Sequence, residues 1–125
     1  MKVKKRPVNL DLTTFKFPIS SITSILHRVS GVVLFLAVPL IFWALQLSLK
    51  SGEGYESVVE CFNSPLMKLV NWALLSALAY HLVAGIRHLL MDWAIGEELK
   101  SGQLGSKIVL VVSAILIVIL GVWIW

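Results

Sequence analysis

The sequence has 125 residues, of which 58% are hydrophobic and only 14% charged, and its formal net charge is +4. A chain this short and this apolar cannot build one core and still cover it with a polar shell, so the composition excludes an ordinary soluble domain. We therefore treat the chain first as an integral membrane protein.

Three apolar stretches cover residues 29–49, 69–91 and 108–125. Each is close to the roughly 20 residues that a helix needs to cross about 30 Å of hydrocarbon. With their flanking residues they predict an all-α, single-domain protein with transmembrane helices over 22–49, 66–91 and 107–125, preceded by a cytoplasmic segment over 1–21. The basic start is followed by a mixed segment and a long apolar run without a cleavage pattern, so we expect no cleavable signal peptide.

Glycines and prolines agree with these limits. Pro18 precedes two serines that suit a helix N-terminus, and Pro65 follows Ser64 in the same way at the start of the second span. Gly52 and Gly54 are expected to stop the first span. Pro39 lies inside that span, where a membrane helix tolerates a kink if neighbouring helices satisfy the freed carbonyl.

The distribution of basic residues predicts the orientation. Six of them precede or begin the first span: Lys2, Lys4, Lys5, Arg6, Lys16 and Arg28. The loop after the first span is richer in acids, so the N-terminus and the 92–107 loop should be cytoplasmic and the C-terminus periplasmic. A Ser-rich amphipathic start typical of mitochondrial targeting is missing, which favours a bacterial inner membrane. Contact with membrane lipid accounts for the positive charge, and no nucleic-acid partner is expected. Cys61 is the sole cysteine, so neither an internal disulfide nor a cysteine metal site is expected.

His81 is the polar residue predicted to lie deepest. It stands ten residues before Met91, which places it about 15 Å from the cytoplasmic end of its helix, near the middle of the membrane. One interpretation is a hydrogen bond to a neighbouring helix. The other is an axial bond to haem iron, because a neutral imidazole bound to iron is no longer an unpaired polar group in lipid. Gly85, one turn away, would let a flat macrocycle approach the backbone, although small residues also mark plain helix contacts.

A second axial ligand is not expected within this chain. His88 is seven residues from His81, about 10 Å along the same helix, so the two cannot face each other across one iron. His27 begins the first span and is expected to lie far from His81 in depth. A six-coordinate haem would then take its other ligand from a partner subunit, which would also supply helices to enclose it.

Ser24, His27 and Arg28 form a second polar group on one side of the first helix, with Ser24 and Arg28 spaced i, i+4. Arg28 could simply reach phosphate groups of the membrane, and Ser24 could bond to its own helix. Alternatively, the group lines a pocket for the carbonyl oxygens of a lipid-soluble ligand or for haem propionates. Arg87 and His88 are predicted at the same side of the membrane.

Three stretches, "RPVNLDL", "SILHRVSG" and "HLVAGIRHLLMD", resemble the cytochrome b membrane-anchor subunits of succinate dehydrogenase, respiratory complex II. The likeness covers nearly the whole chain and includes the family patterns Ser-x-x-His-Arg-x-Ser and His-x-x-x-Gly-x-Arg-His. The resemblance implies that His81 is an axial ligand to the iron of haem b, that Ser24 and Arg28 line the ubiquinone pocket, and that His27 and Arg28 lie near the haem propionates.

The same resemblance implies a set of partners. A second three-helix anchor would give the other axial histidine, and a flavoprotein and an iron-sulfur subunit would dock on the cytoplasmic face. The chain would then serve succinate:ubiquinone oxidoreduction without being catalytic alone. Two alternatives stay open: the anchor of a fumarate reductase and a haem-free membrane scaffold. The roles of Arg87, His88 and Asp92 are not assigned.

Overall fold

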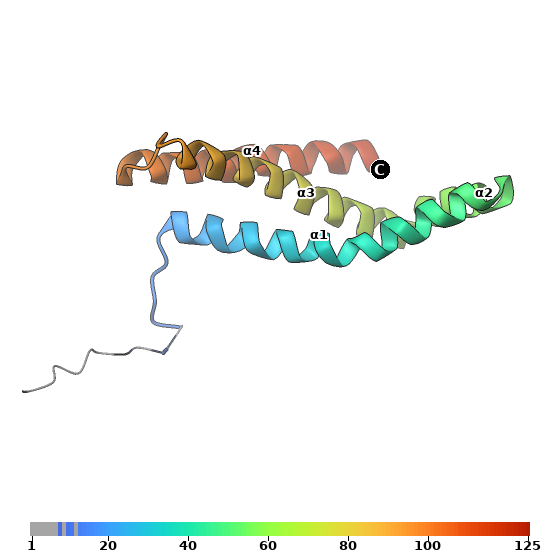
Figure 1. Ribbon diagram of the computed structural model, residues 1–125, viewed down its shortest axis with the longest axis horizontal. Coiled ribbons are helices and arrows are strands. Elements are labelled where there is room, and N and C mark those ends of the chain that lie inside the picture. The colour runs from blue at the N-terminus through green and yellow to red at the C-terminus, as the bar shows by residue number, and fades with distance from the viewer. Residues whose placement is uncertain (1–7, 9, 12) are drawn as a thin grey trace, which may run out of the picture.

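The computed structural model describes residues 8, 10, 11 and 13–125. Over this part the chain is all-helical, in the order α1 (Ile19–Lys50), α2 (Gly52–Asn63), α3 (Pro65–Asp92) and α4 (Leu99–Ile124). The long helices α1, α3 and α4 lie side by side, and the short α2 joins α1 to α3 at one end (Figure 1). These three are long and apolar enough to cross a membrane, which confirms the predicted all-α architecture with three candidate spans. The basic residues Lys2, Lys4, Lys5 and Arg6, and most of the stretch "RPVNLDL", lie outside the described residues.

Pro18 directly precedes α1. Its backbone is extended, with φ −63° and ψ 152°, so the helix begins only at the next residue, Ile19. The helix begins three residues before the predicted span, and it continues through Pro39 to Lys50. As a result, His27 lies eight residues inside the helix.

The helix α2 was not predicted, because its glycines indicated a loop. The Ser51 side chain accepts a hydrogen bond from the Gly54 backbone N–H at 3.0 Å, so Ser51 caps a new helix directly after α1 ends. Gly54 is needed at this reversal, since a Cβ there would collide with the Leu47 carbonyl oxygen. The acidic side chains of α2 are exposed at this end of the molecule.

The turn between α3 and α4 is shorter than the predicted loop over 92–107. α3 ends with hydrogen bonds from the N–H groups of Ala94 and Ile95 to the carbonyls of Met91 and Leu90, at 2.9 and 3.0 Å. Ala94 has φ +59°, the left-handed conformation that this type of helix end requires. Because α4 begins at Leu99, the polar stretch 99–107 is helical and packs against α3 instead of forming a loop.

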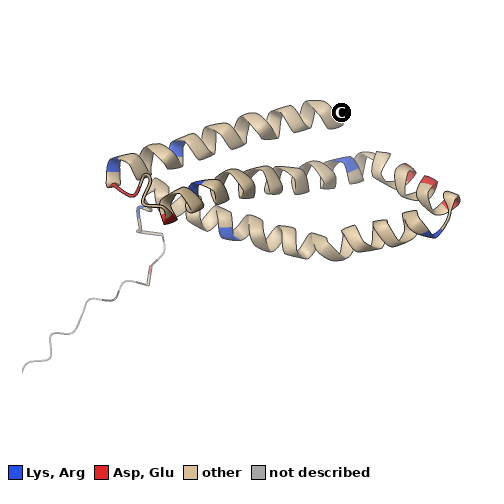
Figure 2. Ribbon diagram, turned by 45° about the horizontal axis from the view of Figure 1, so that its top comes forward, with Lys and Arg blue, Asp and Glu red and all other residues tan. Residues whose placement is uncertain are grey.

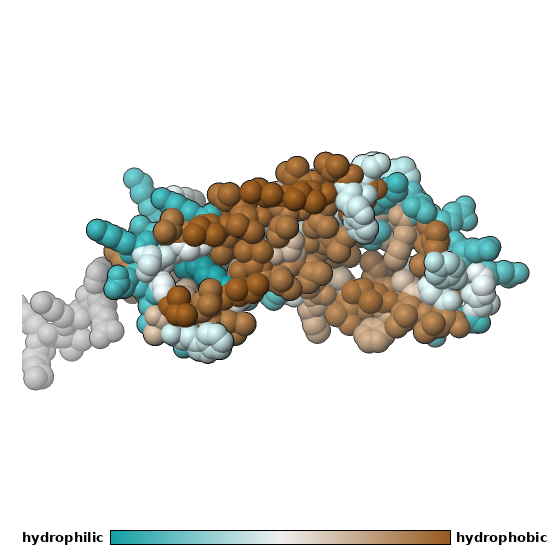
Figure 3. All heavy atoms as spheres, turned by 90° about the horizontal axis from the view of Figure 1, so that it is seen from above, coloured by the Kyte–Doolittle hydropathy of each residue, from teal (hydrophilic) through white to brown (hydrophobic). Residues whose placement is uncertain are grey.

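Small residues contribute to the helix packing. The buried apolar residues include Ala37, Ala44 and Ala84, whereas large apolar side chains point outward along all three long helices. Small residues let helix backbones approach closely where lipid supplies the apolar environment. In the space-filling view, a hydrophobic belt separates two hydrophilic ends (Figure 3). Charged residues gather toward the same two ends of the bundle (Figure 2), as expected for a protein that spans a bilayer.

Candidate functional site

The three histidines of the chain lie together where α1 crosses α3. The imidazole of His27, from α1, stacks on that of His81, from α3, with ring centroids 4.1 Å apart and an interplanar angle of 12°. On its other side the ring of His27 is 4.9 Å from the ring of His88, tilted by 47°. His27 thus fits between two histidines that are two turns apart on α3.

This arrangement corrects the prediction that His27 and His81 differ greatly in depth. Because α1 begins at Ile19, His27 lies about 12 Å along α1. His81 lies eleven residues before the end of α3 at Asp92, about 16 Å from that end. The difference is only about one helical turn, and the side chains span it.

The role predicted for Gly85 also changes. A Cβ built on Gly85 would lie 3.5 Å from Nε2 of His27, so the imidazole of His27 covers this glycine. The missing side chain therefore accommodates a contact between α3 and α1. This was the alternative explanation for a small residue at this position.

Nδ1 of His81 is held by two oxygen atoms of α1. It lies 3.0 Å from the Ser30 hydroxyl and 3.1 Å from the His27 carbonyl oxygen. The Ser30 hydroxyl itself donates to the His27 carbonyl at 2.8 Å. A carbonyl only accepts hydrogen bonds, so Nδ1 carries the proton and donates it. Nε2 then keeps its lone pair, and it has no hydrogen-bond partner among the described residues. This tautomer, fixed through Nδ1 by a backbone carbonyl, is the one that metal-ligating histidines use.

Gly31 and Ser30 position His81, and their role was not predicted. A Cβ on Gly31 would lie 3.0 Å from Cε1 of His81, closer than side-chain atoms normally approach. Gly31 is therefore required for the observed position of the ring. Both residues belong to the quoted stretch "SILHRVSG", and Ser30 follows His27 by three residues on the same face of α1. The three-residue spacing between His27 and Ser30 was the feature of the sequence that could have predicted a role for Ser30 beside the histidines.

A buried polar network ties the three long helices together next to the histidines. The Tyr80 hydroxyl of α3 donates to the Thr23 carbonyl of α1 at 2.8 Å. Thr23 and Ser106 of α4 are fully buried, and their hydroxyls are 3.3 Å apart. The Ser106 hydroxyl lies 3.4 Å from the Ser20 hydroxyl and donates to the Gly102 carbonyl at 3.0 Å. Because every member has a partner, this network fixes the relative rotation of α1, α3 and α4.

Ser24 and Arg28 stand on the flank of α1 that continues outward from His27. Ser24 is half-buried and Arg28 is exposed, and neither makes a hydrogen bond or ion pair with another described residue. Ser24 does not bond to its own helix, whereas the adjacent Thr23 does, at 3.2 and 3.0 Å to the carbonyls of Ile19 and Ser20. Both side chains are thus free to bind a ligand or a neighbouring subunit at this flank.

Comparison with known proteins assigns the chain to a family. The family of succinate dehydrogenase/fumarate reductase transmembrane subunits matches residues 2–120. The chain belongs to this family.

Similar proteins named succinate dehydrogenase cytochrome b556 subunit occur in several bacteria. The one from Coxiella burnetii is 48% identical over 122 residues, which cover 97% of this chain and 98% of the relative. The one from Rickettsia conorii is 41% identical, covering 94% of this chain and 92% of the relative. The one from Paracoccus denitrificans is 31% identical, covering 91% and 88%. The relatives are thus subunits of an oxidoreductase complex.

Two further charged residues of this transmembrane subunit have distinct environments. Arg87, on α3, turns toward α4, where Nη2 donates to the Gly102 carbonyl at 3.1 Å. A Cβ on Gly105 would lie 3.2 Å from Nε of Arg87, so this glycine makes room for the guanidinium. Arg87 therefore joins α3 to α4 and does not face the histidines. Asp92 is exposed at the end of α3.

Proposed function

We propose that the chain is the cytochrome b anchor of a succinate:ubiquinone oxidoreductase in a bacterial inner membrane. In this proposal His81 binds haem b together with a second anchor subunit, and Ser24 and Arg28 form part of the ubiquinone site. Family membership supports the complex, and the relatives named above are all called succinate dehydrogenase subunits, which favours this direction over fumarate reduction.

The hydrogen bonding of His81 Nδ1 to α1 is the observation that carries the haem proposal. Nδ1 donates to α1 while Nε2 presents a free lone pair in the plane of the ring. His27 stacks on the face of that ring and so does not cover the in-plane lone pair. Haem b held through Nε2 of His81 would supply a one-electron redox centre within the membrane.

The second axial ligand is assigned to the partner anchor. Two axial histidines point their nitrogens at one iron from opposite sides. The rings of His27 and His81 stack face to face with their centroids only 4.1 Å apart, which leaves no room for an iron between them. His88 is tilted against His27 and lies two turns from His81. Among the described residues, no group of three His, Cys, Asp or Glu side chains could hold a metal ion either.

The ubiquinone proposal rests on Ser24 and Arg28. Their polar groups have no partner among the described residues, and they share one flank of α1 near its N-terminal end. The Ser24 hydroxyl donates a hydrogen bond to one quinone oxygen. The Arg28 guanidinium stabilises negative charge that develops on the quinone oxygens during reduction. In this proposal His27 and Arg28 would also lie near the haem propionates. At this boundary, water can deliver the two protons that ubiquinol formation needs.

The partners and topology complete the proposal. Flavoprotein and iron-sulfur subunits dock at the cytoplasmic end, near the N-terminus of α1, and deliver electrons from succinate. The C-terminus of α4 lies in the periplasm. Reporter fusions test this topology, and a cytoplasmic C-terminal reporter would contradict it.

Absorption spectroscopy of the purified complex tests the haem assignment. His81→Ala should abolish or strongly shift the reduced b-type signal, whereas His88→Ala should leave the ligation intact. A normal spectrum in His81→Ala would refute the assignment. Absence of any haem signal in the wild-type complex would favour the haem-free scaffold.

Two parallel assays test the quinone site. Ser24→Ala and Arg28→Leu should each strongly reduce succinate-dependent ubiquinone reduction, Arg28→Leu more so because a charge-assisted bond is lost. Succinate oxidation by an artificial acceptor that takes electrons before the quinone site should persist. Ser21→Ala and Lys107→Leu are matched controls, a half-buried serine one turn earlier and an exposed cation near the same end, and both should retain quinone reduction. A parallel loss of both activities, or no loss in either, would contradict the site.

A further inference from the structure

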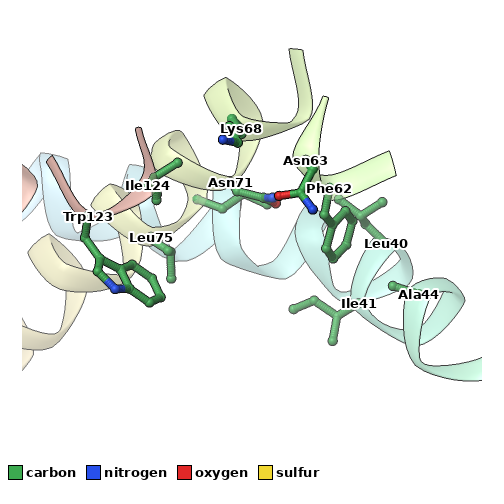
Figure 4. A pocket seen from close by; sticks show the side chains of 11 residues that line it. Leu40, Ile41, Ala44, Phe62, Asn63, Lys68, Asn71, Leu75, Trp123 and Ile124 are labelled. Atoms are coloured by element: carbon green, nitrogen blue, oxygen red, sulfur yellow. The ribbon is translucent and has the colours of Figure 1, made fainter. Parts of the chain in front are cut away.

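A pocket of about 460 Å³ lies at the end of the bundle that carries α2, away from the histidines (Figure 4). It forms where the C-terminal half of α1, the end of α2, the start of α3 and the end of α4 meet. Its walls are mostly apolar, and include Leu40, Ile41, Leu75 and Trp123, whereas Lys68 and Asn71 bring polar groups to it. The pocket is thus apolar with a cationic side.

The position of these residues along their helices defines the depth of the pocket. Lys68 is the fourth residue of α3, and Trp123 is next to the last residue of α4. This side therefore lies at the level of the helix ends, where lipid headgroups meet the hydrocarbon. Leu40 is ten residues before the end of α1, about 15 Å deeper. The pocket extends from headgroup level into the acyl region of one leaflet.

Lys68 and Asn71 have no ion-pair or hydrogen-bond partner in the described part of the chain. The Lys68 ammonium lies 6.0 Å from the centroid of the Trp125 ring, and no described carboxylate pairs with it. Asn71, one turn further along α3, is half-buried, and its amide makes no hydrogen bond with a described residue. An ammonium and an amide N–H beside an apolar wall match a phosphate group attached to acyl chains.

We infer that this pocket binds a phospholipid with an anionic headgroup. Its phosphate lies against Lys68 and Asn71, and an acyl chain follows the wall formed by Leu40, Ile41 and Leu75. A quinone could also fill apolar walls, but it carries no anionic group to place against the ammonium. The inference depends on the three spans and not on the haem or quinone assignments. With the proposed topology, the lipid belongs to the periplasmic leaflet.

Native mass spectrometry of the purified complex tests this inference, using phosphatidylglycerol and phosphatidylcholine with identical acyl chains. The wild-type complex should retain phosphatidylglycerol preferentially. Lys68→Gln should lower that retention about fivefold, the expected effect of one lysine near a lipid phosphate. Lys68→Arg should preserve it. Lys50→Gln is the matched control, an exposed lysine at the same end but outside the pocket, and should change nothing.

A second variant tests the location independently of charge. Leu75→Trp fills the apolar part of the pocket and should lower the retention of both lipids. Equal retention of both lipids by the wild type, or unchanged retention in Lys68→Gln or Leu75→Trp, would overturn the inference. Displacement of phosphatidylglycerol by excess ubiquinone would assign the pocket to a quinone and overturn it as well.

Discussion

Replacing Gly31 by alanine is the sharpest test of how the fold positions His81. The new Cβ would lie 3.0 Å from Cε1 of His81, whereas carbon atoms in favourable contact are about 3.5–4.0 Å apart. The ring must therefore move away from α1 by a few tenths of an ångström. Both partners of Nδ1, the Ser30 hydroxyl and the His27 carbonyl, belong to α1. The movement consequently lengthens both hydrogen bonds at once.

The expected cost follows from those two bonds. They measure 3.0 and 3.1 Å, so a displacement of this size brings both to the limit of hydrogen-bond length. Nδ1 shares its one proton between the two oxygens, and a hydrogen bond contributes about 1 kcal/mol net, so Gly31→Ala should destabilise the α1–α3 contact by about 1 kcal/mol. Since Nδ1 also fixes the tautomer and direction of His81, the absorption spectrum of the bound haem should shift in the same variant.

The assay combines the thermal unfolding midpoint of the purified complex with its reduced-haem spectrum. Gly85→Ala is the matched control, because its Cβ would lie 3.5 Å from Nε2 of His27, an ordinary contact. This control should keep both the midpoint and the spectrum, since alanine also favours helix over glycine. If Gly31→Ala leaves both measurements unchanged, or Gly85→Ala proves the more damaging, the argument that Gly31 positions His81 is wrong.

Three further substitutions test the packing through the unfolding midpoint of the complex. Ala94→Gly should raise the midpoint, which corresponds to a gain of about 0.5–1 kcal/mol of stability, because Ala94 has φ +59° and glycine adopts this conformation without strain. A lower midpoint would contradict the left-handed conformation at the end of α3. Trp72→Phe should lower the midpoint, which corresponds to a loss of about 1 kcal/mol of stability, because Nε1 of Trp72 donates a hydrogen bond to the Ile117 carbonyl at 2.9 Å. An unchanged midpoint would mean that this hydrogen bond contributes nothing. Ser113→Ala should raise the midpoint, again by about 1 kcal/mol, since the buried Ser113 hydroxyl has no hydrogen-bond partner in the described part of the chain; a clear loss of stability would show that the hydroxyl is needed.

The sequence by itself determined the all-helical architecture with three long apolar helices. Apolar stretches of membrane-spanning length predicted the three long helices, because helical rise and bilayer thickness leave few other solutions. Proline also marked helix starts correctly at Pro18 and Pro65, since its effects are local to the backbone. The polar residues of the apolar stretches stood out for the same reason, because lipid makes each unpaired polar group costly.

The tertiary structure alone decided which residues meet. Helices that are apolar on nearly all sides have no strong polar face to show how they are rotated, so spacing along one helix could not predict contacts between helices. The stacking of His27 on His81, the need for Gly31 instead of Gly85, and the turn of Arg87 toward Gly102 all depend on that rotation. It is set by close contacts of small residues and by the hydrogen bonds of Thr23, Tyr80 and Ser106, which join positions far apart in the chain.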